Sequence, residues 1–150
     1  MQFYVKDIMS TDLITVREDT AIRDLIKIFA DKGVLGVPVI DKEGYVTGVV
    51  SSIDILKNES SHTFYLDPLM RNFEMSLLED VKFFDQPVSN IMSRDVYSIG
   101  PNESIARMAR IMYDKKIHRL LVTEYNKLVG LVTTFDLLKL LASSDEEVVI

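Results

Sequence analysis

The chain contains one stretch of sequence twice, and this internal repeat limits its possible folds more than any other feature. Residues 48–57 read GVVSSIDILK and residues 130–139 read GLVTTFDLLK, at an offset of 130 − 48 = 82. Upstream, VKDIMSTDLITV at 5–16 aligns with VSNIMSRDVYSI at 88–99, at an offset of 88 − 5 = 83. The offset changes at the expected turn at 41–44, where the loss of one residue is tolerated. One structural module has therefore been duplicated in tandem.

Length and charge narrow the classes of protein that are possible. A chain of 150 residues, of which 47% are hydrophobic, can bury one good core or two small fused ones. Each repeat has only about 55 residues, so a separate core would be marginal and we expect the two halves to share one. The net charge of −6 argues against nonspecific binding to nucleic acid, which needs a basic surface.

The sequence also carries information about its compartment. It contains no run of about 18 apolar residues that could span a membrane, and residues 1–9 lack the basic and then apolar pattern of a signal peptide. The absence of cysteine excludes disulfides and thiol chemistry and is compatible with a reducing environment. We therefore expect a soluble protein of the cytoplasm.

Hydrophobic spacing predicts the element order β-α-β-β-α in both repeats, and thus an α/β (α+β) fold. The first repeat is expected to hold a helical turn at 5–11, a strand at 13–16, a helix with the apolar stripe Ile22, Leu25, Ile26 and Phe29, strands at 37–40 and 45–50, and a helix from residue 51. The second is expected to hold a strand at 96–99, a helix with the stripe Ile105, Met108, Ala109 and Met112, strands at 120–124 and 127–132, and a helix at 133–141. We interpret Met108 and Met112 as packing in the core or on a dimer face.

Individual residues predict how some of these elements begin and end. Asp19 or Thr20 in the first repeat, and Asn102 in the second, can cap the following helix. Gly33 suits the left-handed position that ends a helix. Pro38 cannot donate a main-chain hydrogen bond, so we expect it at the start of a strand or on an edge strand.

The first repeat covers residues 1–57 and the second 88–142, and the segments between and after them follow neither copy. Within the linker at 58–87, seven apolar residues have helical spacing and predict one long amphipathic helix: Leu66, Leu69, Met70, Phe73, Leu77, Leu78 and Val81. A connection of this length is usually structured or functional. The helix either packs over the module or offers an apolar surface to a partner or second subunit. The acidic tail at 143–150 is expected to fray.

Each repeat closes on a hydroxyl residue followed three positions later by an aspartate, as Ser51 and Asp54 and again as Thr133 and Asp136. At a helix start, this pair lies on one face and matches the capping-box pattern. The carboxylate can also accept hydrogen bonds from both hydroxyls of a ribose, and free amides at the helix start favour an anion. The capping and ligand-binding roles can coexist.

Two tandem units that each open on I-M-S-x-D and close on G-h-h-[ST]-x-x-D, where h is apolar, resemble a pair of cystathionine β-synthase (CBS) domains. The resemblance covers residues 5–57 and 88–140. It implies that the repeats fold together as one pseudo-twofold disc. It also implies that clefts between the repeats bind adenine nucleotides or other adenosyl compounds such as S-adenosylmethionine, and that two discs pair as a homodimer.

The same resemblance implies that each cleft takes its ribose-binding aspartate from one repeat and its base and phosphate contacts from the other. The first site would combine Ser51, Asp54, Tyr97, Ser98, His118 and Arg119. The second site would combine Ile14, Thr15, Leu35, Gly36, Thr133 and Asp136.

The two predicted sites differ in charge. His118 and Arg119 match a pair that some nucleotide-binding members of the family place on phosphates, and a guanidinium can bind a phosphate with two hydrogen bonds. The aligned positions, 118 − 83 = 35 and 119 − 83 = 36, hold the uncharged Leu35 and Gly36. We therefore expect a phosphorylated ligand at the first site, and a less charged ligand or none at the second. A structural histidine and a solvated or salt-bridged arginine are the alternatives.

The sequence shows no catalytic arrangement. It has no cysteine, G-x-S-x-G elbow, P-loop or H-E-x-x-H motif, and His62 in the linker has no His or Cys beside it to form a metal site. We predict a stand-alone, non-catalytic regulatory module that binds an AMP, ADP or ATP type of ligand, needs no cofactor, and signals in trans to an unidentified protein partner. The alternative is a ligand-free scaffold that dimerises and docks a partner.

Overall fold

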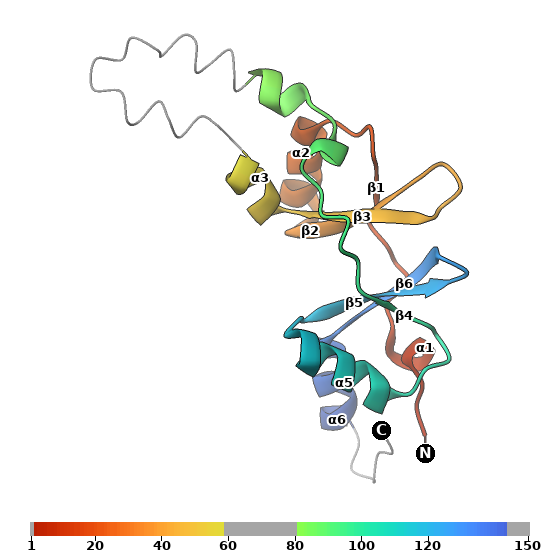
Figure 1. Ribbon diagram of the computed structural model, residues 1–150. Coiled ribbons are helices and arrows are strands. Elements are labelled where there is room, and N and C mark those ends of the chain that lie inside the picture. The colour runs from red at the N-terminus through yellow and green to blue at the C-terminus, as the bar shows by residue number, and fades with distance from the viewer. Residues whose placement is uncertain (1, 59–80, 144–150) are drawn as a thin grey trace. The chain divides into compact units, whose positions relative to one another are not determined.

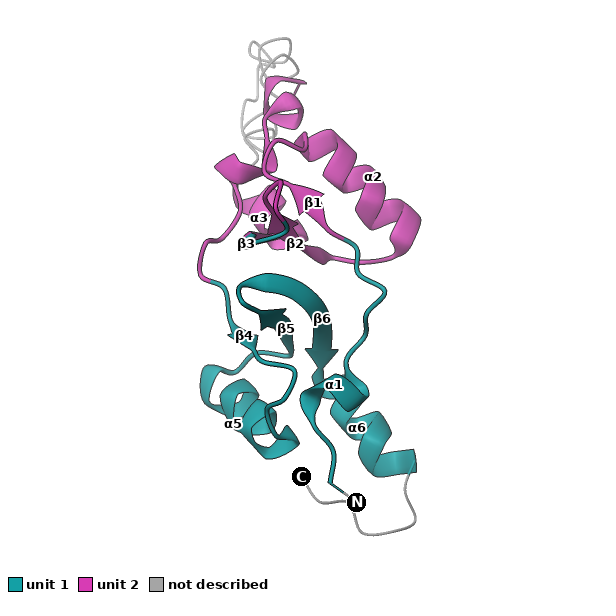
Figure 2. Cartoon of the chain, turned by 90° about the vertical axis from the view of Figure 1, so that its right-hand side faces the viewer, with its two compact units in different colours: residues 1–14, 44–46, 96–150 teal, residues 15–43, 47–95 magenta. Residues whose placement is uncertain are grey.

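The computed structural model describes residues 2–58 and 81–143. The chain forms two compact units, which are coloured separately in Figure 2. Unit 1 is made of residues 1–14, 44–46 and 96–150, and unit 2 of residues 15–43 and 47–95. Helices and strands occur in both units, so the predicted α/β class is confirmed (Figure 1).

Unit 2 is built on a three-stranded sheet with the strand order β1-β2-β3. Its elements are β1 (Val16–Arg17), α2 (Ile22–Lys32), β2 (Gly36–Ile40), all but the first residue of β3 (Val46–Ser51), α3 (Ser52–Asn58) and the short 3₁₀ helix η2 (Val88–Asn90). β1 runs parallel to β2, with Val16 opposite Val39. Helix α2 buries Ile22 and Leu25 completely, which are the first two residues of the predicted apolar stripe.

Unit 1 has the same architecture, with a sheet in the order β4-β5-β6. Its elements are α1 (Val5–Ile8), β4 (Ser98–Ile99), α5 (Ile105–Lys115), β5 (Arg119–Glu124), β6 (Lys127–Thr133) and α6 (Thr134–Ser143). β4 is parallel to β5, and β5 and β6 form an antiparallel hairpin. Met108 and Met112 of α5 are buried in the core of this unit, which identifies them as core residues.

The predicted helix caps are wrong in both repeats. Helix α2 starts after Ala21, whose side chain cannot cap, and α5 starts after Ser104, whose hydroxyl accepts a hydrogen bond from the Arg107 amide at 3.1 Å. Thr20 instead accepts a hydrogen bond from the Arg17 amide and stabilises the preceding turn. Asp19, Thr20 and Asn102 are good capping residues by type, but they lie before the point where the chain enters the helix.

The prediction that Pro38 lies at a strand start or on an edge strand is also wrong. Pro38 is buried in the middle of β2, the central strand of its sheet. The equivalent position in the second repeat is Leu121 (38 + 83 = 121), and its hydrogen bonding shows how the first repeat tolerates a proline here. The Leu121 amide donates to the Tyr97 carbonyl at 3.2 Å, a bond that a proline cannot make. Accordingly, β4 begins at Ser98, whereas β1 begins one aligned position later, at Val16.

The opening segment of each repeat lies in the compact unit that holds the rest of the other repeat. In unit 1, the Val5 amide donates to the Glu103 carbonyl at 3.0 Å, and Val5 is fully buried in a core formed by α5, β5 and β6. In unit 2, the Val88 amide donates to the Thr20 carbonyl at 2.8 Å, and Val88 is fully buried. The two hydrogen bonds are equivalent in the repeat, because Val5 aligns with Val88 (5 + 83 = 88) and Thr20 aligns with Glu103 (20 + 83 = 103). The chain therefore forms two compact units instead of the one shared core that was predicted, and each unit contains the opening segment of the other repeat.

This exchange explains the glycine that begins each closing motif. A methyl group on Gly48 would lie 2.7 Å from the Ser93 carbonyl oxygen and 2.7 Å from the Sδ atom of Met92. On Gly130 it would lie 2.5 Å from the Sδ atom of Met9. Each opening segment therefore crosses a strand at a point where only glycine leaves enough room.

Most of the predicted linker helix falls outside the described residues, including Leu66, Leu69, Met70, Phe73, Leu77 and Leu78. The described end of the linker, residues 81–85, is helical. There Phe83 is buried, and Asp85 forms an ion pair with Arg23 of α2 at 2.5 Å. The end of the linker is therefore packed on unit 2.

Candidate ligand-binding residues

The closing motif forms a capping box in both repeats. The Ser51 amide donates to Oδ2 of Asp54 at 2.8 Å, and the Asp54 amide donates back to the Ser51 hydroxyl at 3.4 Å. The corresponding distances for Thr133 and Asp136 are 2.8 Å and 3.2 Å. In both repeats the hydroxyl also donates to Oδ2, at 3.1 Å. The spacing of the motif therefore predicted its local geometry correctly.

The cap leaves part of each carboxylate unused. All the hydrogen bonds that Asp54 and Asp136 accept from described residues go to Oδ2, while Oδ1 accepts none from that part of the chain. A carboxylate can accept about four hydrogen bonds. Both aspartates are partly buried, so the free oxygen lies in a position with limited competition from water. The geometry therefore allows a capping and a ligand-binding role in the same side chain.

Six of the predicted ligand residues lie close together within unit 1, at the end of the sheet where β5 starts and β6 ends. The His118 carbonyl accepts a hydrogen bond from the Thr134 amide at 2.9 Å, and Arg119 pairs with Thr133 in the strand register. On the other side of β5, Ser98 is paired with Leu121. The grouped residues are Tyr97, Ser98, His118, Arg119, Thr133 and Asp136.

This grouping differs from the one drawn from the family resemblance. Within unit 1, His118 and Arg119 adjoin Thr133 and Asp136, which were assigned to the other site. His118 and Arg119 are exposed, and Arg119 has no ion-pair partner among the residues that the structure describes. Its guanidinium is therefore available to an anion.

Unit 2 repeats this arrangement without the basic pair, because Leu35 and Gly36 stand at the positions of His118 and Arg119. The Leu35 carbonyl accepts a hydrogen bond from the Ser52 amide at 2.9 Å, as His118 does from Thr134, and Leu35 is 68% exposed. Gly36, Thr15, Ser51 and Asp54 belong to the same unit, whereas Ile14 ends a segment of unit 1. The assignment of these residues to two particular sites stays a prediction.

Two lysines that sequence reasoning missed adjoin the predicted residues. The ammonium group of Lys115 lies 5.8 Å from the centre of the Tyr97 ring, a distance at which a cation and an aromatic face attract. Lys116 follows directly and adopts the left-handed conformation, with φ 56° and ψ 45°. Alignment of the repeats held a signal for Lys116, because the equivalent residue, 116 − 83 = 33, is Gly33.

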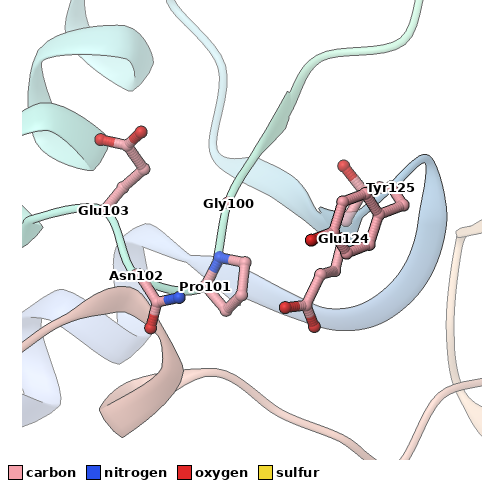
Figure 3. A pocket seen from close by; sticks show the side chains of 7 residues that line it. Gly100, Pro101, Asn102, Glu103, Glu124 and Tyr125 are labelled. Atoms are coloured by element: carbon pink, nitrogen blue, oxygen red, sulfur yellow. The ribbon is translucent and has the colours of Figure 1, made fainter.

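A separate hollow of about 330 Å³ lies between residues 100–103 and the turn that joins β5 to β6 in unit 1 (Figure 3). Its lining residues are Gly100, Pro101, Asn102, Glu103, Thr123, Glu124 and Tyr125. None of them is a predicted ligand residue, and the two glutamates would repel an anionic ligand. The hollow therefore offers no place for a phosphorylated compound.

Two negative findings concern the part of the chain that the structure describes. There, no three His, Asp or Glu side chains are placed to hold one metal ion. Among the same residues, no helix is long and apolar enough to cross a bilayer.

Sequence relatives cover most of the chain. The CBS domain family model matches residues 5–61 and 88–143. The uncharacterized protein MJ1426 of Methanocaldococcus jannaschii is 30% identical over 152 aligned residues, which cover 91% of this chain and 90% of the relative. Two further proteins of that organism are longer, and the chain spans only 41% and 43% of their lengths.

Solved structures share the fold over nearly the whole chain. The CBS domain of a membrane protein from Sphaerobacter thermophilus is similar with a TM-score of 0.73 at 26% identity, over 93% of this chain and 88% of that one. The CBS domain pair of protein MJ0100, solved in complex with 5′-methylthioadenosine and S-adenosyl-L-methionine, gives a TM-score of 0.69 at 25% identity, over 95% and 98%. Together with the two family matches, these likenesses show that the chain belongs to the CBS domain family and carries two CBS domains in tandem.

Proposed function

We propose that this CBS domain pair is a non-catalytic regulatory module that binds an adenosine-containing ligand. The observation that carries the proposal is the Oδ1 atom of Asp54 and of Asp136, which accepts no hydrogen bond from the described residues and is held partly buried at a helix start. Such an oxygen is suited to accept hydrogen bonds from ribose hydroxyls. The related MJ0100 pair, which was solved with two adenosyl compounds, supports the same class of ligand.

The charge difference between the repeats supports two unequal ligands. We assign a phosphate to Arg119 and His118 together with ribose binding by Asp54, as the family resemblance implies. The combination of Asp136 with the uncharged Leu35 and Gly36 would suit a less charged adenosyl compound. An exposed guanidinium without an ion-pair partner in the described part of the chain favours a phosphorylated ligand of the AMP, ADP or ATP type.

Ligand binding would be transmitted through a change in the equilibrium between two arrangements of the protein. A ligand shifts such an equilibrium only by the difference between its affinities for the two states. We propose that a protein partner in the cytoplasm, or a second copy of the chain, responds to this shift. No cofactor is required for this activity.

A ligand-free scaffold is a second candidate, and exposed apolar side chains favour it. Ile53 and Leu56 of α3 are 55% and 68% exposed, and their equivalents on α6, Phe135 and Leu138, are 71% and 61% exposed. Apolar helix faces repeated in both halves are suited to dimerisation or partner docking. The two functions differ in whether the free aspartate oxygens matter for binding.

Binding measurements with isosteric variants test the proposal. Asp54→Asn keeps one oxygen for the capping box but replaces the free oxygen by an NH₂ group, which cannot accept a ribose hydrogen bond. Asp136→Asn makes the same change in the other repeat. We expect isothermal titration with AMP, ADP, ATP and S-adenosylmethionine to show binding to the wild type. Binding of the phosphorylated ligand should be lost in Asp54→Asn and Arg119→Ala and retained in Asp136→Asn.

The competing results are distinct. Failure of all four compounds to bind the wild type would favour the scaffold. Loss of phosphorylated-ligand binding in Asp136→Asn but not in Asp54→Asn would show that Arg119 acts with the aspartate of its own repeat. In that case the assignment of residues to the two sites would be wrong, while the class of ligand would stand.

A further inference from the structure

Two methionines hold equivalent positions in the opening segments, because Met9 aligns with Met92 (9 + 83 = 92). In unit 1, a Cβ atom on Gly130 would lie 2.5 Å from the Sδ atom of Met9, and in unit 2 a Cβ atom on Gly48 would lie 2.7 Å from that of Met92. Both glycines are buried. Each sulfur atom therefore packs directly against the glycine of a closing motif.

These two methionines differ in exposure from the others that the structure describes. Met108 and Met112 are 0% and 4% exposed, whereas Met9 and Met92 are partly exposed. An oxidant dissolved in water reaches a partly exposed thioether more readily than a buried one. The chain has no cysteine that would react in place of methionine. Met9 and Met92 are therefore the described side chains most open to oxidation at sulfur.

The residue after each methionine holds the opening segment on a strand. In unit 1, the Ser10 amide donates to the Leu131 carbonyl at 2.8 Å, and the Leu131 amide donates back to the Ser10 carbonyl at 3.0 Å. In unit 2, Ser93 and Val49 exchange the same pair of hydrogen bonds, at 2.8 Å and 2.9 Å. Leu131 and Val49 directly follow the two glycines. Each sulfur atom thus lies beside the hydrogen bonds that attach its segment.

We propose that Met9 and Met92 are oxidative modification sites, and that a peroxide acting there loosens each opening segment from the strand that it crosses. The thioether sulfur donates an electron pair to one oxygen of hydrogen peroxide, so an S–O bond forms while the O–O bond breaks. The leaving hydroxide takes the proton of the transferred oxygen and departs as water. Methionine is oxidised to its sulfoxide and the peroxide is reduced. This modification does not depend on the ligand that the module binds.

The sulfoxide oxygen would find neither space nor a hydrogen bond at the position of the sulfur. The Met9 sulfur already occupies the space that Gly130 leaves, and the neighbouring amides of Ser10 and Leu131 are bonded to each other's carbonyls. A buried polar atom without a hydrogen bond is unfavourable, so the oxidised side chain should turn toward water. Met9 packs against the core of unit 1, and this turn would remove that packing.

Treatment of the purified full-length chain with hydrogen peroxide tests the proposal. Peptide mass spectrometry should find the sulfoxide at Met9 and Met92 before it appears at Met108 or Met112. Hydrogen exchange at the Leu131 and Val49 amides should then be about tenfold faster than in the untreated protein. Methionine sulfoxide reductases A and B should restore slow exchange, with a dithiol as the reductant that becomes a disulfide while the oxygen leaves as water.

Leucine variants assign the effect to each sulfur atom, because leucine has a similar volume and cannot form a sulfoxide. After peroxide treatment, Met9→Leu should keep slow exchange at Leu131 but not at Val49, and Met92→Leu should show the reverse. Met108→Leu, at a buried methionine, is the matched control and should respond as the wild type does.

Three results would overturn the proposal. The first is oxidation of Met108 and Met112 as fast as that of Met9 and Met92. The second is sulfoxide at Met9 and Met92 with unchanged exchange at both amides. The third is faster exchange at Leu131 in peroxide-treated Met9→Leu, which would place the responsible residue elsewhere.

Discussion

At the scale of single residues, the two closing glycines are equivalent in the repeat but have unequal neighbours. An alanine at Gly48 would press on the carbonyl oxygen of Ser93, which can yield only if the main chain moves. At Gly130 the closest atom belongs to the flexible side chain of Met9. We expect Gly48→Ala to lower the free energy of unfolding by about 1–3 kcal/mol and Gly130→Ala to lower it less. Urea unfolding of the two variants checks this order, and an equal or reversed order would contradict it.

The capping aspartates permit a second prediction at this scale. Truncation by Asp54→Ala or Asp136→Ala removes the acceptor of a 2.8 Å hydrogen bond and should lower the free energy of unfolding by about 0.5–2 kcal/mol. The corresponding asparagine variants keep an acceptor and should lose less. Thermal melts without ligand measure the difference. If Asp54→Asn is as unstable as Asp54→Ala, the asparagine cannot separate the cap from the ligand role.

Residues whose role depends on near neighbours in sequence could be predicted, and those that depend on distant ones could not. The capping boxes and the left-handed Gly33 follow from local spacing and were predicted correctly. The position of Pro38 in a central strand was not predicted correctly. A proline is tolerated there because β1 pairs with β2 only at Val16 and Arg17, so no partner requires a hydrogen bond from residue 38. The caps Asp19, Thr20 and Asn102 failed for a related reason, since main-chain hydrogen bonds from the opening segments hold the carbonyls of Thr20 and Glu103 just before each helix.

At the scale of elements, the opening segments determine which parts of the chain depend on one another. Val5 is buried in the core of unit 1, where the Leu131 amide of β6 donates to the Ser10 carbonyl at 3.0 Å. Val5→Ala should destabilise this unit by about 1–3 kcal/mol and speed hydrogen exchange at Leu131, in the other repeat. Exchange at Val49, in the same repeat as the mutation, should be affected less.

Val88→Ala is the matched test of the same idea. The Val49 amide of β3 donates to the Ser93 carbonyl at 2.9 Å, so this variant should speed exchange at Val49 rather than at Leu131. Equal loss of protection at both amides in both variants would contradict independent local opening. It would show that the two units unfold together.

The element order could be predicted from hydrophobic spacing, whereas the exchange of opening segments could not. Spacing shows which face of an element is buried but not which repeat covers it. The sequence feature related to this exchange is the glycine in each closing motif. Gly48 and Gly130 align, but the sequence does not show that an opening segment packs against each of them. The strands at 13–16 and 96–99 were predicted too early because only Val16–Arg17 and Ser98–Ile99 pair with a neighbour.

At the scale of the whole molecule, the repeated apolar faces on α3 and α6 bear on assembly. If the chain forms the homodimer expected from its family resemblance through these faces, Phe135→Lys with Leu138→Lys should shift it to a monomer. Tyr113→Lys, at an 83% exposed aromatic on α5, is the control and should leave the dimer intact. Light scattering during size-exclusion chromatography gives the mass. A wild-type monomer, or a dimer that survives the double substitution, would contradict the prediction.

The family could be predicted from sequence, whereas the ligand and the site that binds it stay proposals. The paired aspartates and the His118-Arg119 pair are visible in the aligned repeats, and the family relationship is confirmed by two matches in the chain. Which groups act on the same ligand depends on contacts between residues far apart in sequence. Lys116 was overlooked although it aligns with Gly33, because the left-handed backbone angle that the two residues share is seen only in the structure.

The exchange of opening segments also has a consequence for how such a chain could have arisen. A fragment holding only residues 88–143 would contain the residues that form β4, α5, β5, β6 and α6 but would lack the segment that covers Gly130. Its own opening segment would be left without a strand to cross. Two identical fragments could satisfy both needs by trading segments, and duplication with fusion would then join the traded pair in one polypeptide. We therefore expect an isolated half to be either unfolded or an intertwined dimer, and the ancestor of the chain to have been the latter.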